Sequence, residues 1–176
     1  MPSMRFYLLA FLLAPILLAN RSQFEPVATQ NVAQQPDAAA RPQEVPEEVR
    51  AEMEEGIKHL LVSQVEAWNH GKLEEFMQGY WQSPDLTFFS GAAVTKGWEP
   101  TLLRYRQRYQ AQGKEMGKLE FQDLTIDLLS RRSAVVTGKW QLTMSDGKQP
   151  HGLFTLIFKR MPAGWKIVHD HTSAAE

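Results

Sequence analysis

The chain has 176 residues, with 19 Lys and Arg against 20 Asp and Glu, a formal net charge of −1, and no cysteine. The balanced charge argues against a nucleic-acid-binding protein, which needs a clustered basic surface. The missing cysteines exclude disulfides, thiol nucleophiles, thiolate-bound metals and lipid attachment to an N-terminal cysteine. Any chemistry must therefore come from residue types such as His, Tyr, Asp and Glu.

The first 45 residues differ in composition from the rest. Arg5 precedes an apolar run over residues 6–18, which as a helix would span about 20 Å of the ~30 Å hydrocarbon core. We therefore expect residues 1–19 to be a signal peptide, or otherwise an uncleaved anchor in the inner membrane, and the protein to be periplasmic or secreted. Residues 20–45 are rich in Gln, Ala and Pro and predict a disordered linker. The folded domain is expected over residues 46–174, without a membrane span.

The domain begins with helical periodicity and then changes to strand periodicity. Apolar residues at steps of three and four predict a helix over residues 47–69, which Gly71 ends, and a shorter helix over 72–81. Strands are expected over 86–90 and 92–96, and a third helix begins near Trp98 and ends by Gly113. Four further strands follow over 118–129, 133–144, 152–159 and 165–171, joined by short turns that imply antiparallel neighbours. Helices gathered on one face of such a sheet make an α+β domain, with room for a small-molecule pocket.

Five segments carry a resemblance to a known family: Ala67–Leu73, Asp85–Phe88, Lys96–Trp98, Gly152–Leu156 and Gly164–Ser173. Together with the element order, they resemble the nuclear-transport-factor-2-like (NTF2-like) superfamily, in its SnoaL-like or DUF4440-type group, over residues 47–173. The resemblance implies a cone of three helices packed in a curved, mostly antiparallel six-strand sheet, usually as a homodimer. Relatives include isomerases, cyclases, dehydratases and modules that only bind or assemble, so no single activity is implied. Lys72 departs from the acidic residue that is frequent after this glycine.

The last predicted strand contains His169, Asp170 and His171. On a strand the two histidines share one face and Asp170 points to the other. If the histidine face lines the pocket, His169 and His171 are candidate general acid/base groups. Alternatively, one histidine bonds a helix end or a dimer partner and the other is solvated. A metal site would need a third ligand, for which His151 is the nearest candidate, so we expect no metal and no cofactor.

Aromatic side chains are frequent in the predicted helices and strands, where they more often form a core than a ligand site. The candidates for pocket walls are Trp68, Tyr80, Phe88, Trp98, Tyr105, Trp140 and Phe154. The hydroxyls of Tyr80 and Tyr105 can hold an enol or carbonyl oxygen, which makes Tyr80 a third catalytic candidate. The isomerase relatives imply an aspartate base as well, but Asp123 and Asp127 are expected to face solvent.

Two functions remain open from the sequence. The first is an exported module whose apolar pocket binds a small hydrophobic molecule without catalysis. The alternative is a cofactor-free isomerase, cyclase or hydratase with a pocket histidine as base and a tyrosine as oxyanion donor. The three arginines of the third helix, Arg104, Arg106 and Arg108, can bind an anion, although balanced charge favours a solvated helix face. We expect a homodimer through the outer face of the last strands, at Leu153, Ile157 and Val168.

Overall fold

The computed structural model describes residues 45–175. The signal peptide or anchor expected over 1–19 lies outside the described residues, as does the expected linker over 20–45 except for Val45. Within the part of the chain that is described, no helix combines the length and apolar character needed to cross a membrane.

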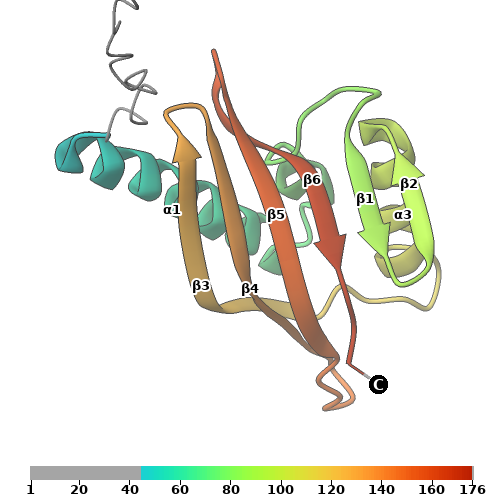
Figure 1. The fold of residues 1–176 in the computed structure, drawn as a ribbon. Coiled ribbons are helices and arrows are strands. Elements are labelled where there is room, and N and C mark those ends of the chain that lie inside the picture. The colour runs from blue at the N-terminus through green and yellow to red at the C-terminus, as the bar shows by residue number, and fades with distance from the viewer. Residues whose placement is uncertain (1–44, 176) are drawn as a thin grey trace, which may run out of the picture. The chain divides into compact units, whose positions relative to one another are not determined.

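Within residues 45–175, three helices and six strands follow one another in the expected order (Figure 1). They are α1 (Glu47–Asn69), α2 (Leu73–Met77), β1 (Thr87–Ser90), β2 (Ala93–Lys96), α3 (Trp98–Tyr109), β3 (Lys118–Ser130), β4 (Ser133–Thr143), β5 (His151–Met161) and β6 (Gly164–Thr172). The strands form one sheet in the order β2-β1-β6-β5-β4-β3. All neighbours are antiparallel except β1 and β6, which run parallel. This arrangement confirms the α+β fold with a curved, mostly antiparallel six-strand sheet.

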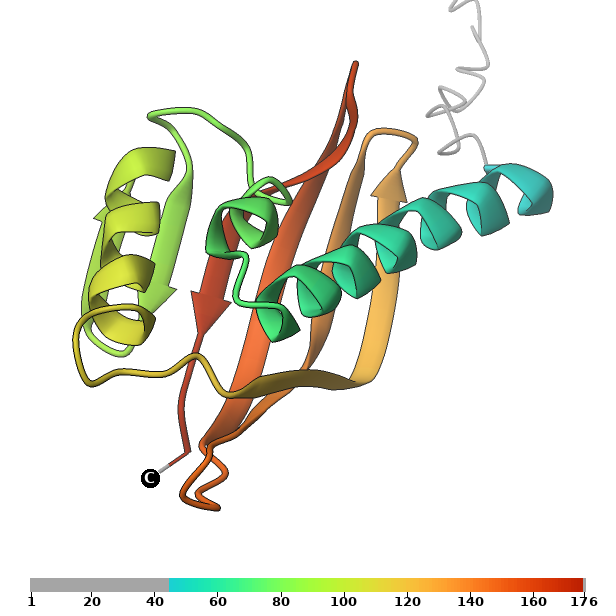
Figure 2. The ribbon, with the colours of Figure 1, turned by 180° about the vertical axis from the view of Figure 1, so that it is seen from behind.

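The helices all cover the same face of the sheet, as the rear view shows (Figure 2). Helix α1 buries Met53, Ile57, Leu61 and Trp68, whose three- and four-residue spacing puts them on one side of the helix. They form one core with strand residues such as Phe158, which is 0% exposed. The core therefore lies between the helix layer and the concave side of the sheet.

Helix α2 is shorter than expected, because the chain after it joins the sheet. The sequence pattern predicts a helix as far as residue 81, but α2 ends at Met77. Tyr80 instead forms a parallel bridge with Ile167 of β6. Ile167 N–H donates to Gly79 O at 3.0 Å, and Trp81 N–H donates to Ile167 O at 2.9 Å. This pairing with a distant strand outweighs the local helical preference and fixes Tyr80 beside β6.

Strand β3 bends at an irregularity near Asp123. The register shifts between Gln122 and Thr125, and Asp123 has a positive φ of 53°. On the neighbouring strand β4, a Cβ added to Gly138 would meet the Phe154 ring at 2.7 Å. The bend and this glycine together leave room for the Phe154 ring on the concave side of the sheet.

Candidate functional site

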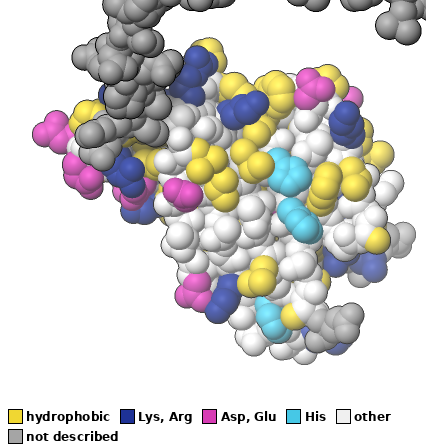
Figure 3. All heavy atoms as spheres, in the orientation of Figure 1, with side chains coloured by type: hydrophobic (Ala, Val, Ile, Leu, Met, Phe, Trp, Pro, Cys, Tyr) yellow, Lys and Arg dark blue, Asp and Glu magenta, His cyan; other side chains and the backbone are white. Residues whose placement is uncertain are grey.

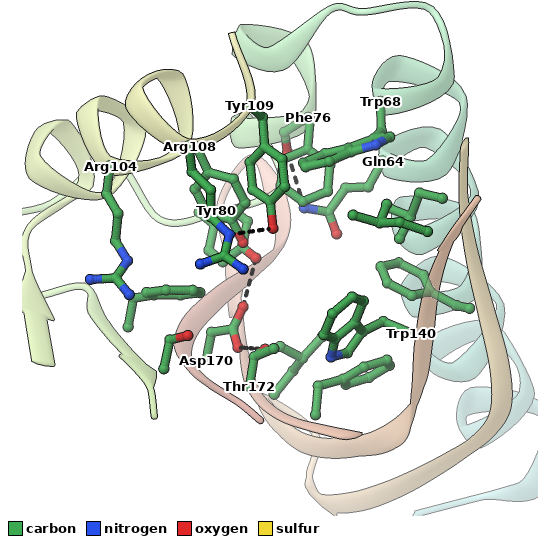
Figure 4. A pocket seen from close by; sticks show the side chains of 18 of the residues that line it. Gln64, Trp68, Phe76, Tyr80, Arg104, Arg108, Tyr109, Trp140, Asp170 and Thr172 are labelled. Atoms are coloured by element: carbon green, nitrogen blue, oxygen red, sulfur yellow. Dashed lines mark hydrogen bonds between the residues drawn. The ribbon is translucent and has the colours of Figure 1, made fainter. Parts of the chain in front are cut away.

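A cavity of about 100 Å³ opens on the concave side of the sheet, between the three helices, strand β1 and strands β3 to β6 (Figure 4). Nine aromatic side chains are among the residues that line it. Of the expected wall residues, six line it: Trp68, Tyr80, Phe88, Tyr105, Trp140 and Phe154. Phe76, Tyr109 and Phe121 line it as well. Six of the seven expected wall residues therefore border one cavity, which has room for several waters or a small ligand.

Trp98 differs from the other expected wall residues, because it does not line the cavity. Its indole N–H donates to the carbonyl oxygen of Met77 at 2.9 Å, so the ring joins the start of α3 to the end of α2. Trp98 begins α3, whereas Tyr105 lies about two turns further along the helix. Only the later part of α3 borders the cavity.

Two tryptophans of the wall are fixed by hydrogen bonds to the backbone. Trp68 N–H donates to Met116 O at 3.1 Å, and Trp140 N–H donates to Ser173 O at 2.9 Å. A Cβ on Gly152 would collide with the Ser173 carbonyl, so this glycine lets the C-terminal segment lie against β5. These contacts fix the positions of both tryptophans in the wall.

Asp170 is the acidic group of the cavity, and its side chain is almost completely buried, at 2% exposure. Its Oδ2 accepts a hydrogen bond from the Tyr80 hydroxyl at 2.7 Å, and its Oδ1 accepts one from the Thr172 hydroxyl at 2.6 Å (Figure 4). Burial raises the pKa of Asp170 from 3.8 to about 6, while these two hydroxyl donors act in the opposite direction. Such a carboxyl can both accept and return a proton near neutral pH.

Two phenols accompany this carboxyl. Burial raises the pKa of Tyr80 well above its usual value, and the nearby Asp170 charge raises it further. The pKa of Tyr105 is raised in the same way, first by burial and then by Asp170. Both hydroxyls therefore stay protonated at neutral pH: the Tyr80 hydroxyl donates to Asp170, and the Tyr105 hydroxyl is a further donor beside this pair.

His169 and His171 do not line the cavity, contrary to the sequence expectation. The register of β5 and β6 shifts, so that Phe158 pairs with Ile167 and Ile157 pairs with His169. Val168 is the extra residue of this bulge, and it reverses the side-chain alternation for the rest of β6. Trp165 and Ile167 face the core as expected, but beyond the bulge Asp170 faces inward and the histidines face outward.

On the outer face the two histidines contact β1. His169 Nδ1 lies 2.6 Å from the Thr87 hydroxyl oxygen, and the Phe89 ring lies 4.9 Å from the His169 ring and 6.0 Å from the His171 ring. Burial and the neighbouring His171 lower the pKa of His169. These imidazoles are therefore separated from the cavity by the sheet. Within residues 45–175, no three His, Asp or Glu side chains come together as a metal site would require.

Asp170 is a cavity residue that sequence reasoning missed, and Arg104 and Arg108, for which a solvated helix face was favoured, line the cavity as well. Asp170 lies inside the motif that the sequence singled out. The consecutive apolar residues Ile167 and Val168 were the available signal in the sequence that the strand alternation breaks there.

Comparison with known proteins places this site in a family. A family model described as a SnoaL-like domain matches residues 57–176, which is more than half of the chain. The chain belongs to the SnoaL-like domain family. A search of curated proteins finds no match.

Solved structures agree with the fold of this SnoaL-like domain. An NTF2-like protein of unknown function from Shewanella oneidensis is 37% identical, with a TM-score of 0.64 over 68% of this chain and 98% of that chain. An NTF2-like superfamily protein from Salmonella enterica is 20% identical, with a TM-score of 0.58 over 73% and 92% of the two chains. A protein from Catenulispora acidiphila, solved in complex with S-DNPA, is 17% identical, with a TM-score of 0.59 over 70% and 94%. The resemblance to the NTF2-like superfamily is confirmed.

Proposed function

We propose that the cavity binds a small, largely apolar carbonyl compound and that the protein moves a proton on it, as a cofactor-free isomerase, cyclase or hydratase. Asp170 carries this proposal, because it is a buried carboxyl in an aromatic cavity whose pKa is raised to about 6. Active sites use burial in this way to match a carboxyl to proton transfer near neutral pH. The base is therefore assigned to Asp170 in place of His169 or His171.

The proposed step uses groups that already lie together. The Asp170 carboxylate removes a proton from the carbon next to the ligand carbonyl, and the C–H electron pair forms the C=C bond of an enolate. The carbonyl π pair moves to oxygen, where the hydroxyl of Tyr105 donates a hydrogen bond. Asp170 then returns the proton at another position of the ligand. The aromatic wall keeps the enolate away from water, which strengthens these electrostatic contacts.

The test is proton exchange on a simple probe. Phenylacetone has an aromatic body and acidic hydrogens next to its carbonyl, and deuterium uptake from D₂O is measured by mass spectrometry. The protein should accelerate uptake, and Asp170→Asn should lower the rate by about a hundredfold or more. The double variant His169→Gln/His171→Gln is the matched control and should keep the activity. Equal rates for the protein and Asp170→Asn would contradict the proposal.

A binding module without catalysis is the second candidate function. The observation that favours it is that both carboxylate oxygens of Asp170 already accept hydrogen bonds, from Tyr80 and Thr172. In this function the carboxylate shapes and polarises the pocket and removes no proton from the ligand. If phenylacetone binds but its exchange is no faster than in buffer, this function replaces the enzyme.

We further propose that two copies associate through the sheet face that the helices leave uncovered. Hydrophobic and histidine side chains gather on this face (Figure 3). Leu153 is 58% exposed there and Ile157 is half-buried, whereas Val168 lies in the bulge and is 9% exposed, so its share of the contact is smaller than the sequence suggested. Light scattering should give a dimer mass, with Leu153→Asp shifting it toward the monomer. A monomer mass at micromolar concentration would contradict this proposal.

Export is proposed from residues 1–19 alone. The intact mass of the protein recovered from the periplasm or the medium would test it, since a signal peptide would be missing and an anchor would be retained. Recovery of the full-length chain from the soluble cytoplasm would contradict both.

A further inference from the structure

Two of the three arginines of α3 face the cavity. Arg104 and Arg108 are four residues apart, so they lie on the same side of the helix, and both line the cavity (Figure 4). Arg106 lies between them in sequence and has a different environment. Its guanidinium donates to the Glu74 carboxylate, and both side chains are about half exposed. Helix α3 therefore directs Arg106 to a surface ion pair and the other two arginines to the cavity.

The two cavity arginines are held by aromatic rings of the wall. The Arg104 guanidinium lies over the Phe88 ring, 5.7 Å from its centroid. Arg108 lies 5.5 Å from the Tyr109 centroid, and its Nε–H donates to the Tyr109 hydroxyl at 3.1 Å. Stacking of this kind fixes the plane of a guanidinium while leaving its other N–H donors available.

Neither arginine forms an ion pair with a carboxylate within residues 45–175. Like charges four residues apart in a helix repel each other, and the C-terminal dipole of α3 offsets this only in part. An anion between the two guanidinium groups would relieve the repulsion. It would also accept charge-assisted hydrogen bonds from both, which are stronger than neutral ones.

We propose, on the basis of the binding function proposed above, that the natural ligand is a small organic anion with an aromatic or apolar body. Its carboxylate is held by Arg104 and Arg108 at the α3 side of the cavity. Its body lies against the aromatic wall and reaches toward Asp170. The arginines select the anion, and they take no part in the proton transfer at Asp170.

The experiment compares two probes of nearly the same shape, phenylacetate and phenylacetamide, by isothermal titration calorimetry at pH 7 on the full chain. The wild-type protein should bind phenylacetate about tenfold more tightly or better, because only the carboxylate forms charge-assisted bonds. Arg104→Gln/Arg108→Gln should remove this preference and leave phenylacetamide binding within about twofold, which also shows that the cavity is intact. Arg106→Gln, on the same helix, is the matched control and should keep the preference.

The outcomes separate this proposal from the proposed function. Equal binding of the two probes, or a loss of preference in Arg106→Gln as large as in the double variant, would overturn the anion assignment. The proton-transfer function would still stand if phenylacetone exchange depended on Asp170. If neither probe bound, the anion assignment would be overturned together with small-molecule binding.

Discussion

The buried carboxyl of Asp170 should make the protein less stable as the pH rises. Folding raises its pKa from 3.8 to about 6, and each unit of pKa corresponds to about 1.4 kcal/mol. A group whose pKa is raised by folding stabilises the folded state fully below its unfolded pKa, and this stabilisation is lost as the pH rises through the folded pKa. Asp170 therefore lowers the free energy of unfolding by about 3 kcal/mol between pH 3 and pH 8.

Asp170→Asn removes this dependence, because asparagine has no proton to lose. Its amide can keep one acceptor for the Tyr80 hydroxyl, as a protonated carboxyl does. The free energies of unfolding are measured with urea for both proteins at pH 4 and pH 8. From pH 4 to pH 8, the free energy of unfolding of the variant should rise by about 2–3 kcal/mol relative to that of the wild type. The difference is slightly smaller than the full effect, because aspartate in the unfolded chain is already about half-ionised at pH 4.

The comparison across pH cancels any constant effect of the substitution. Asp127→Asn removes one charge from the exposed part of β3 and serves as the control for net charge. A difference between wild type and Asp170→Asn that stays constant with pH would refute the raised pKa. A difference of opposite sign would mean that the cavity stabilises the ionised carboxylate.

Three further substitutions test the Tyr80 hydrogen bond, the packing at Gly152 and the core at Phe158. Tyr80→Phe removes a hydrogen-bond donor that lowers the pKa of Asp170. Carboxyl ¹³C NMR should therefore show Asp170 titrating above about 6 in this variant. A lower midpoint would contradict the assigned role of this hydrogen bond. Gly152→Ala places a methyl group against the Ser173 carbonyl and should cost about 1–3 kcal/mol of unfolding free energy in urea; unchanged stability would mean that the C-terminal segment is not held there. Phe158→Ala empties a fully buried position and should cost about 3–5 kcal/mol, and a loss below about 1 kcal/mol would place this ring outside the core.

The elements of the fold were predictable because their signals are local. Apolar spacing in α1, the Gly71 stop and the short turns between β3, β4, β5 and β6 each act over a few residues. The end of α2 was not predictable in this way. Gly79 and Tyr80 continue a helical pattern, but hydrogen bonds to Ile167, almost ninety residues later in the chain, draw them into the sheet.

The polar residues of the site could not be predicted correctly, because one backbone irregularity in β6 decides which of them face inward. Strict alternation from Trp165 and Ile167 leads to His169 and His171 on the inner face, and a single extra residue at Val168 exchanges them for Asp170. The aromatic wall was easier to predict, because large rings at helical and strand spacing must lie on the apolar side of their elements. Arg104 and Arg108 could not be distinguished from Arg106 by composition, since only the position of α3 decides which of them meet the cavity.

The central claim is that Asp170 is a titrating carboxyl inside a ligand-binding cavity. It is tested most directly by a carboxyl ¹³C NMR titration of the labelled protein, with the Asp170 signal assigned from Asp170→Asn, in the absence and presence of phenylacetate. The Asp170 signal should titrate with a midpoint near pH 6, and this midpoint should move upward when the anion binds, because a nearby negative charge and the exclusion of water both disfavour the carboxylate. A midpoint near 4, or one near 6 that saturating phenylacetate leaves unchanged, would contradict the central claim.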